Sequence, residues 1–364
     1  MTRQQTFWND VFRVRPGQIA WPVATRIGIA LAVPVAILVA TGHGGWTLYT
    51  TFGAFAAVYG REPDPVRRVR TRARAAAGLV ACATAGTAVA VATHREWLVI
   101  PVAATAAVVG AALSDRLAWQ PPGALFFVFA VGGCASVPVS PNMIPVALCL
   151  AVAAAMLAIC LDLPVAFIHT GHAKPTGPGT ASPAPGPPVS ERRHEAWHAG
   201  ARCGLAVLIA GIFSTASGWG HPYWAMVAAA ATTAGATADA RLTRGVQRAL
   251  GTFAGLAVTA VLLATHPTLT LTIVVVVILQ VVAELVMGVN YALGLVFVTP
   301  LAILMIGLAR PHLDTATLLS DRALETTIGA AAGITLTLIT RWALPARRQA
   351  ARSRPDGAAL QPGS

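Results

Sequence analysis

Residues 268–288 read TLTLTIVVVVILQVVAELVMG, a run in which Glu284 is the single charged side chain. About 20 apolar residues are enough to carry a helix across the hydrocarbon core of a bilayer. Comparable runs recur from Ile27 to Leu344, with polar turns between them. The whole chain is 55% hydrophobic and 11% charged, whereas soluble domains carry about 25% charged residues. The composition therefore predicts a polytopic membrane protein.

The pattern predicts an all-α protein of twelve transmembrane helices in two parallel six-helix repeats. The first apolar run is expected to stay in the protein, because no small-residue cleavage site follows it. Residues 1–26 would be a cytoplasmic segment, 27–168 the first repeat, 169–200 a Pro/Gly-rich cytoplasmic linker, 201–344 the second repeat and 345–364 a basic cytoplasmic tail. The expected spans are 27–42, 45–60, 75–93, 97–113, 121–137, 143–168, 203–218, 222–238, 249–265, 268–288, 290–309 and 323–343.

The net charge of +12 is explained by membrane orientation. Of the 26 basic residues, all but Arg95, Arg310 and Arg322 fall in segments on one side of this topology. Cytoplasmic loops carry the excess of Lys and Arg, so both termini are expected in the cytoplasm. The lipid bilayer is then the expected partner, no nucleic acid is predicted, and association into a homo-oligomer is left open.

The two halves share a short motif, which indicates an internal duplication. Each half holds a His-x-x-Trp motif followed at a fixed spacing by an arginine. The motifs are His43–Trp46 and His221–Trp224, and Arg70 and Arg248 each follow 24 residues after the tryptophan. Because both repeats have an even number of spans, they would enter the membrane from the same side. Both motifs are expected at the outer membrane surface, in an aromatic belt.

The segment HEAWH at 194–198 fits the zinc-protease pattern H-E-x-x-H. On a helix, His194 and His198 would share one face with Glu195 beside them as a general base. The motif, however, lies at the end of the Pro/Gly-rich linker, and no later histidine stands at the spacing of a third ligand. The favoured interpretation is the start of an amphipathic helix with a solvated His198. No metal or other cofactor is predicted.

Polar residues inside the apolar runs are the candidates for a transport pathway. Gln280 and Glu284 are four apart and share one face of a helix, and an ionisable group in a span is a functional-site hypothesis by default. Pairing of Glu284 with a loop arginine is the structural alternative. Arg322 and Glu325, three apart, are expected to pair with each other. The candidate pathway residues are Arg26, Arg202, Tyr223, Trp224, Arg248, Gln280, Glu284, Asn290, Tyr291 and Pro300.

The second half resembles the fusaric acid resistance (FUSC) family, which includes bacterial aromatic acid exporters. The segments that carry the resemblance are HPYW at 221–224, RGVQRALGTFAG at 244–255, Glu284-Leu-Val, Asn290-Tyr-Ala, Thr299-Pro-Leu-Ala and Leu324-Glu-Thr-Thr-Ile-Gly. The likeness is clearest over 200–340. Larger members insert a soluble domain between their halves, whereas here a short linker stands in that place. The first half also has no glutamate that corresponds to Glu284.

The resemblance implies a membrane transporter, an efflux protein for small organic or aromatic acids rather than an enzyme. The site is expected between the halves, where helices 1, 2, 7, 8 and 10 would converge. Inner arginines would gather an organic anion there, and Glu284 would exchange a proton. Two alternatives remain from other classes: a membrane scaffold or envelope-assembly protein without transport, and a zinc metalloprotease that uses His194 and His198.

Overall fold

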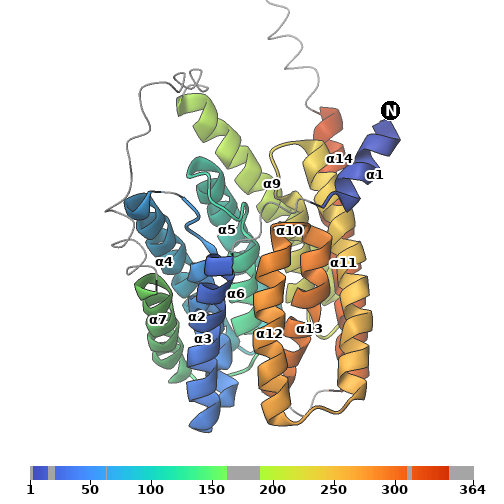
Figure 1. The fold of residues 1–364 in the computed structure, drawn as a ribbon. Helices are drawn as coiled ribbons and strands as arrows, with labels where there is room; N and C mark the ends of the chain where they lie inside the picture. Colours follow the sequence, from blue (N-terminus) through green and yellow to red (C-terminus); the bar gives the residue numbers. More distant parts are fainter. Residues whose placement is uncertain (1–2, 15–20, 63, 162–188, 310–313, 344–364) are drawn as a thin grey trace, which may run out of the picture.

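The structure, a computed structural model, describes residues 3–14, 21–62, 64–161, 189–309 and 314–343. Within these ranges the chain forms helices and turns without a strand, which confirms the predicted all-α class (Figure 1). The helices are α1 (Arg3–Phe12), α2 (Trp21–Ala40), η2 (Gly44–Trp46), α3 (Thr47–Ala54), η3 (Phe55–Val58), α4 (Pro65–Ala90), α5 (Arg95–Arg116), α6 (Leu125–Ala135), α7 (Met143–Cys160), α9 (Val189–Ala216), α10 (Tyr223–Thr233), α11 (Ala238–Ala264), α12 (Leu269–Met287), α13 (Tyr291–Ala309) and α14 (Thr315–Ala343).

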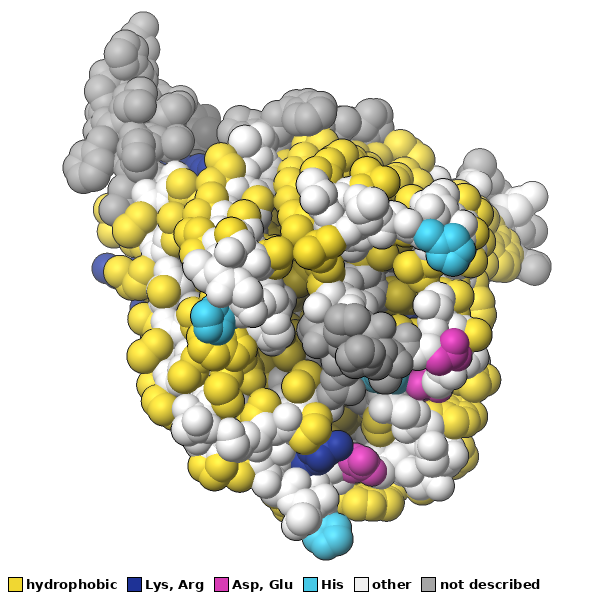
Figure 2. Space-filling view, turned by 90° about the horizontal axis from the view of Figure 1, so that it is seen from below, with side chains coloured by type: hydrophobic (Ala, Val, Ile, Leu, Met, Phe, Trp, Pro, Cys, Tyr) yellow, Lys and Arg dark blue, Asp and Glu magenta, His cyan; other side chains and the backbone are white. Residues whose placement is uncertain are grey.

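Eight of the helices in the described part of the chain are long and apolar enough to cross a membrane. They are α4, α5, α7, α9, α11, α12, α13 and α14. This finding confirms a multi-pass membrane protein, although twelve spans were predicted. Figure 2 shows the end of the molecule opposite to α1, where hydrophobic side chains predominate and charged ones are few.

The difference in number comes from four helices: α3, α6 and α10, which are short, and α2, whose apolar part, Ala24–Ala40, also falls short of a full span. Helix α3 has 8 residues, and α6 and α10 have 11 each. At a rise of 1.5 Å per residue, 11 residues cover only about 16 Å of a hydrocarbon core of about 30 Å. All 11 residues of α10 are buried. Its apolar sequence therefore reflects contact with protein, which hydropathy alone does not distinguish from contact with lipid.

The longer helices pack in a similar order within each half. In the first half, α4 contacts α6 and α7, and α3 contacts α7. In the second half, α11 contacts α13 and α14, and α10 contacts α14. The halves meet where α5 packs along α9 and where α2 packs against α12. Helix α9 begins at Val189, so the last part of the predicted 169–200 linker is helical; residues 162–188 lie outside the described residues.

Small residues four apart bring the long helices into backbone contact. The small residues are three pairs of glycines. A Cβ added at any of them would meet backbone or side-chain atoms of the facing helix, so a larger residue does not fit without displacement. Such small-xxx-small pairs allow close helix approach in membranes. The pairs are Gly200 and Gly204 of α9 against α5, Gly251 and Gly255 of α11 against α13, and Gly329 and Gly333 of α14 against α10.

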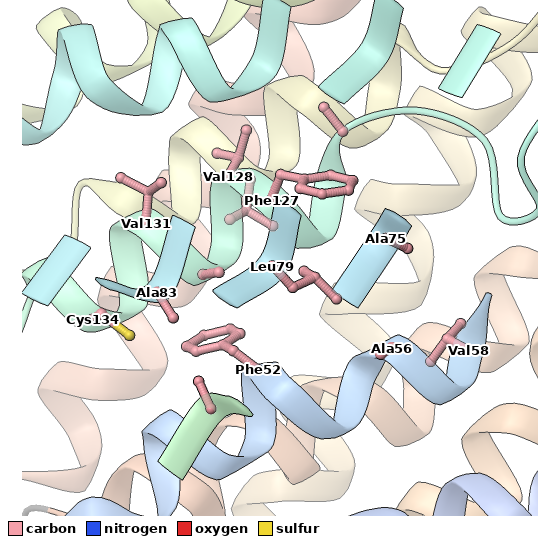
Figure 3. Close-up of a cluster of buried hydrophobic side chains, with 14 of the residues drawn as sticks. Phe52, Ala56, Val58, Ala75, Leu79, Ala83, Phe127, Val128, Val131 and Cys134 are labelled. Carbon is pink, nitrogen blue, oxygen red and sulfur yellow. The ribbon is translucent and has the colours of Figure 1, made fainter. Parts of the chain in front are cut away.

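The largest apolar core lies where α3, α4 and α6 meet. Figure 3 shows Phe52 of α3, Leu79 and Ala83 of α4, and Val128 and Val131 of α6 gathered there. The Phe52 side chain is fully buried, and its ring meets that of Phe129 edge to face with centroids 5.2 Å apart. This core fixes α3 and α6, which also form one wall of the cavity described below.

Alanine substitution tests the close helix approach, because the change in stability caused by Gly→Ala should differ in sign between a closely packed site and an open one. In a helix, Gly→Ala normally stabilises by about 1 kcal/mol. At Gly329 the new methyl group would meet the backbone carbonyl of Ala225, and overpacking of this kind costs about 1–3 kcal/mol. We expect Gly329→Ala to lower the melting temperature of the detergent-solubilised protein.

The matched control is Gly307→Ala on α13, where no atom lies within 4 Å of an added Cβ. This variant should melt at or above the temperature of the unmodified protein. Equal melting temperatures for the two variants would contradict the packing described for α14 and α10.

Candidate functional site

A cavity of about 690 Å³ lies between the two halves of the chain. Side chains from α3, η3 and α6 form one wall, and side chains from α10, α11, α12, α13 and α14 form the other. Its volume falls in the range of pockets that hold small organic molecules. The cavity is the candidate site because it is shared by both halves and is lined by the buried cations Arg248 and Arg322.

Aromatic rings form the wall contributed by the first half. Phe52 and Phe55 face Phe126 and Phe129 across the α3–α6 contact, with ring centroids 5.0 Å apart for Phe55–Phe126. The ring of Tyr223, at the start of α10, stacks on Phe129 at 6.2 Å. This wall offers faces and edges against which a planar ring could pack.

Arg248 of α11 is the first buried cation of the site. Its side chain is 2% exposed, and Nη1 donates to the hydroxyl of Tyr291 at 3.3 Å. Within the described part of the chain, Nε and Nη2 have no hydrogen-bond partner. Buried polar groups are normally hydrogen-bonded, and a buried charge without a partner is costly. The unsatisfied donors therefore point to an anionic ligand.

Arg322 of α14 is the second buried cation, at 3% exposure. Its guanidinium carbon lies 4.9 Å from the ring centroid of Trp224, which is a cation–π contact. Trp224 is in turn stacked on His221, with centroids 4.7 Å apart. Nε and Nη1 of Arg322 have no hydrogen-bond partner among the described residues. Both guanidinium groups line the same cavity.

A buried acidic network lies behind Arg322. Nδ1 of His221 is 2.9 Å from Oδ2 of Asp321, and the backbone N–H of His221 donates to Oε1 of Glu325 at 2.9 Å. The predicted pair of Arg322 and Glu325 is wrong, because these side chains form no ion pair within 4 Å. The guanidinium instead lies over Trp224, and two of its nitrogens are left without a hydrogen-bond partner among the described residues.

Glu284 forms the main ionic contact at the other end of the cavity. Its Oε2 lies 3.7 Å from Nη2 of Arg61, in the segment between η3 and α4, and Nε2 of Gln280 donates to Oε1 at 3.4 Å. Gln280 and Glu284 thus share one face of α12, as predicted. The alternative of pairing with a loop arginine is also confirmed, and this pair joins the two halves.

Helix α1 is held at this same end by side chains of the second half. The carbonyl oxygen of Val11 accepts from Nε2 of Gln247 at 2.8 Å and from Nδ2 of Asn290 at 3.1 Å. Asn290 also donates to the carbonyl of Arg13 at 3.2 Å. Asp10 and Arg13 line the cavity. We call this end of the cavity the mouth at α1. The end of α1 forms part of its wall, which nothing in the sequence indicated.

The structure brings together six of the ten predicted pathway residues. Trp224 lies behind the wall and contacts Arg322. Arg26, Arg202 and Pro300 do not line the cavity: Arg202 lies near Asp115 of α5, and Pro300 is buried within α13. Helix α9, the predicted seventh span, does not contribute to the wall. The six that line the cavity are Tyr223, Arg248, Gln280, Glu284, Asn290 and Tyr291.

The repeat motif misled the sequence analysis at two points. His221 and Trp224 are 7% and 0% exposed, so the second motif lies inside the protein and not in an outer aromatic belt. Arg70 is exposed whereas Arg248 is buried, so the equal spacing does not place them in equivalent surroundings. The sequence analysis placed Arg322 in an outer segment and did not include it among the pathway residues. The feature that could have identified it is an arginine within an apolar helical run.

The HEAWH segment lies on α9, where His194 and His198 are exposed and their rings are 4.9 Å apart. Within the described ranges, no group of three or more His, Cys, Asp or Glu side chains could hold a metal ion. The solvated His198 at the start of a long helix agrees with the favoured interpretation from the sequence. The segment lies outside the cavity.

The fold and the cavity define a multi-pass, all-helical membrane protein with a candidate site between its halves. Residues 206–336 match a family model described as fusaric acid resistance protein-like. The second half of the chain is therefore similar to the FUSC family, as its resemblance predicted, and the matched region covers α10 to α13 and most of α9 and α14. No curated protein and no solved structure matches the chain.

Removal of the side chains that hold α1 should open this mouth. Each hydrogen bond contributes about 1 kcal/mol, so loss of the three bonds in a Gln247→Ala, Asn290→Ala double variant should increase the open population about tenfold or more. A cysteine placed at Thr243, which lines the cavity, would report this opening through faster reaction with a water-soluble maleimide. The five native cysteines would first be replaced by alanine.

Asn142→Ala provides the control, because Asn142 lies in an exposed turn before α7. The labelling rate at position 243 should not change in this variant. A double variant labelled no faster than the control would show that the bonds to Val11 and Arg13 do not hold the mouth closed.

Proposed function

We propose that this protein is a secondary transporter of the bacterial inner membrane that exports small organic or aromatic acids as anions. One observation carries the proposal: Arg248 and Arg322 are both buried, both line one cavity, and both hold N–H groups without a hydrogen-bond partner among the described residues. Guanidinium groups bind carboxylates through charge-assisted hydrogen bonds. A carboxylate bound there would satisfy donors that otherwise remain without partners.

The rest of the cavity suits an organic acid better than an inorganic anion. Phe55, Phe126 and Phe129 line the wall contributed by the first half, and aromatic side chains attract rings through offset or edge-to-face contacts. An inorganic anion would leave this apolar surface in contact with water. The pairing of buried cations with an aromatic wall therefore favours an acid with an apolar body.

The proposal includes twelve membrane passes in two parallel repeats. The helix contacts support it, because each contact described in the first half has a counterpart when α2 to α7 are matched in order with α9 to α14. The contacts between the halves correspond in the same way, since α5 packs on α9 and α12 packs on α2. The short helices α3, α6 and α10 would pass through the membrane together with the segments around them.

Cytoplasmic N- and C-termini are also proposed, from the distribution of arginine. The excess of basic residues on one side of the predicted topology supports this orientation, and few basic side chains are visible on the end opposite to α1 (Figure 2). The mouth at α1, with Arg61 and Arg244 on its wall, would then face the cytoplasm. Positive charge at this mouth would attract anionic substrates from the cell interior.

The remaining predicted pathway residues take different parts in this scheme. Tyr291 holds Arg248 and carries the guanidinium of Arg244 over its ring at 4.7 Å. Glu284 and Gln280 form part of the mouth, and the ion pair of Glu284 with Arg61 favours a role in closing that mouth over proton exchange. Arg26 and Arg202, outside the cavity, are proposed as basic anchors near the membrane surface.

Substitution of either buried arginine tests the proposed function. Arg248→Gln and Arg322→Gln each remove a charged donor whose hydrogen bonds contribute about 1.5–3 kcal/mol. Transport of an aromatic carboxylate into proteoliposomes should therefore require at least about tenfold more substrate for half-maximal rate. The uncharged amide of the same acid should not be transported by any of these proteins.

Arg70→Gln is the matched control, since Arg70 is exposed and outside the cavity. Its transport rate should equal that of the unmodified protein. If the protein moves no aromatic or aliphatic acid in proteoliposomes although it is folded, the alternative of a membrane scaffold without transport would be favoured.

A further inference from the structure

The side chain of Glu325 lies in an unusual environment for a carboxyl group. The residue is 0% exposed; Oε1 accepts the backbone N–H of His221, and Oε2 has no hydrogen-bond partner among the described residues. An ionised carboxylate with one free oxygen in an apolar interior is costly. A proton on Oε2 would remove that charge without breaking the bond at Oε1.

The ionisable groups around Glu325 form one connected set. Its own helix, α14, contributes Asp321 and Arg322, and the start of α10 contributes His221 and Tyr223. Helix α11 contributes Arg248 and helix α13 contributes Tyr291, both of which interact with Arg322. Helix α9 contributes only the uncharged Ser214 beside Glu325. Proton binding at Glu325 therefore acts directly on Arg322, which in turn interacts with Arg248.

With Glu325 ionised, the charges of this set balance in the absence of a ligand. Arg248 and Arg322 supply two positive charges and the carboxylates of Asp321 and Glu325 supply two negative charges, while Nδ1 of His221 lies 2.9 Å from Oδ2 of Asp321. A bound carboxylate would add an uncompensated negative charge inside the membrane. Such a charge is expensive in a medium of low dielectric constant. Uptake of one proton would restore the balance.

We propose that Glu325 is the proton-binding residue of the site, and that an organic anion bound at Arg248 and Arg322 is accompanied by uptake of one proton onto Oε2 of Glu325. The inference rests on the proposed function and adds its ionic coupling. The transported unit would be an anion with a proton, which carries no net charge. Its direction would follow the gradients of the acid and of pH and would not depend on the membrane potential.

The linkage between proton binding at Glu325 and anion binding at the arginines has a definite sign. Protonation of Glu325 removes a negative charge close to Arg322, so it strengthens anion binding, and by reciprocity the bound anion favours protonation. Affinity should therefore fall as pH rises. With one linked proton, the dissociation constant should increase by up to about tenfold per pH unit over the range in which Glu325 must take up its proton.

Calorimetry on the purified full-length protein tests the proposal with benzoate as the probe. Titrations in two buffers with different heats of ionisation give the number of protons taken up per benzoate bound. The unmodified protein should take up about one proton, as the linkage requires. Glu325→Gln, which keeps the acceptor for the His221 N–H, should bind benzoate without proton uptake and with an affinity independent of pH.

Two further variants are controls. Glu96→Gln, which changes an exposed acid in the first turn of α5 outside the cavity, should leave the proton uptake unchanged, and Glu325→Asp should retain it. Benzoate binding without proton uptake in the unmodified protein would overturn the inference and leave the proposed function standing. A complete absence of benzoate binding would overturn both.

Infrared difference spectroscopy covers the case in which Glu325→Gln does not fold. A protonated carboxyl group has its own C=O stretch, distinct from the bands of carboxylate and imidazolium. Benzoate added to the unmodified protein should produce this band, and Glu325→Asp should shift it. If no such band appears while benzoate binds, the proton is not on a carboxyl group and the assignment to Glu325 fails.

Discussion

The burial of two guanidinium groups between helical halves is the constraint on which the rest of the site depends. Arg248 and Arg322 cannot leave the interior, because their positions on α11 and α14 are fixed by helices packed on α13 and α10. A buried cation needs compensation from a nearby acid, an aromatic face or a ligand. The structure supplies each of these in part: acids behind Arg322, the ring of Trp224 beneath it and a cavity in front.

Close helix packing makes this arrangement rigid enough to direct the arginines. Gly329 and Gly333 bring α14 against the backbone of α10, and α10 carries Tyr223 to the cavity and Trp224 to its contact with Arg322. A larger residue at either glycine would separate the helix that bears Arg322 from the helix that bears its aromatic partner. The small residues are therefore part of the site, although none of them lines the cavity.

The fold class and the shared helix face of Gln280 and Glu284 could be predicted from the sequence, because both rest on local patterns. Apolar runs identify helices wherever they occur, and Gln280 and Glu284 share a face through helical spacing alone. Helix α10 was predicted as part of the span 222–238, but its short length could not be recognised, since burial in protein and burial in lipid produce the same composition. The roles of Arg322 and of α1 depend on contacts between distant segments: Asn290 reaches the carbonyl of Val11 from 279 positions away.

The two ends of the cavity are held by contacts of different kinds, and this difference bears on how such a site could open. At the α1 end, the Arg61–Glu284 pair is 3.7 Å apart with Arg61 38% exposed, and partly exposed ion pairs contribute about 0–1 kcal/mol. At the other end, separating His221 from Asp321 and Glu325 would leave buried charges without partners, which costs far more. The mouth at α1 is therefore the end that opens at the lower free-energy cost, while the acidic network stays with the arginines whose charge it balances.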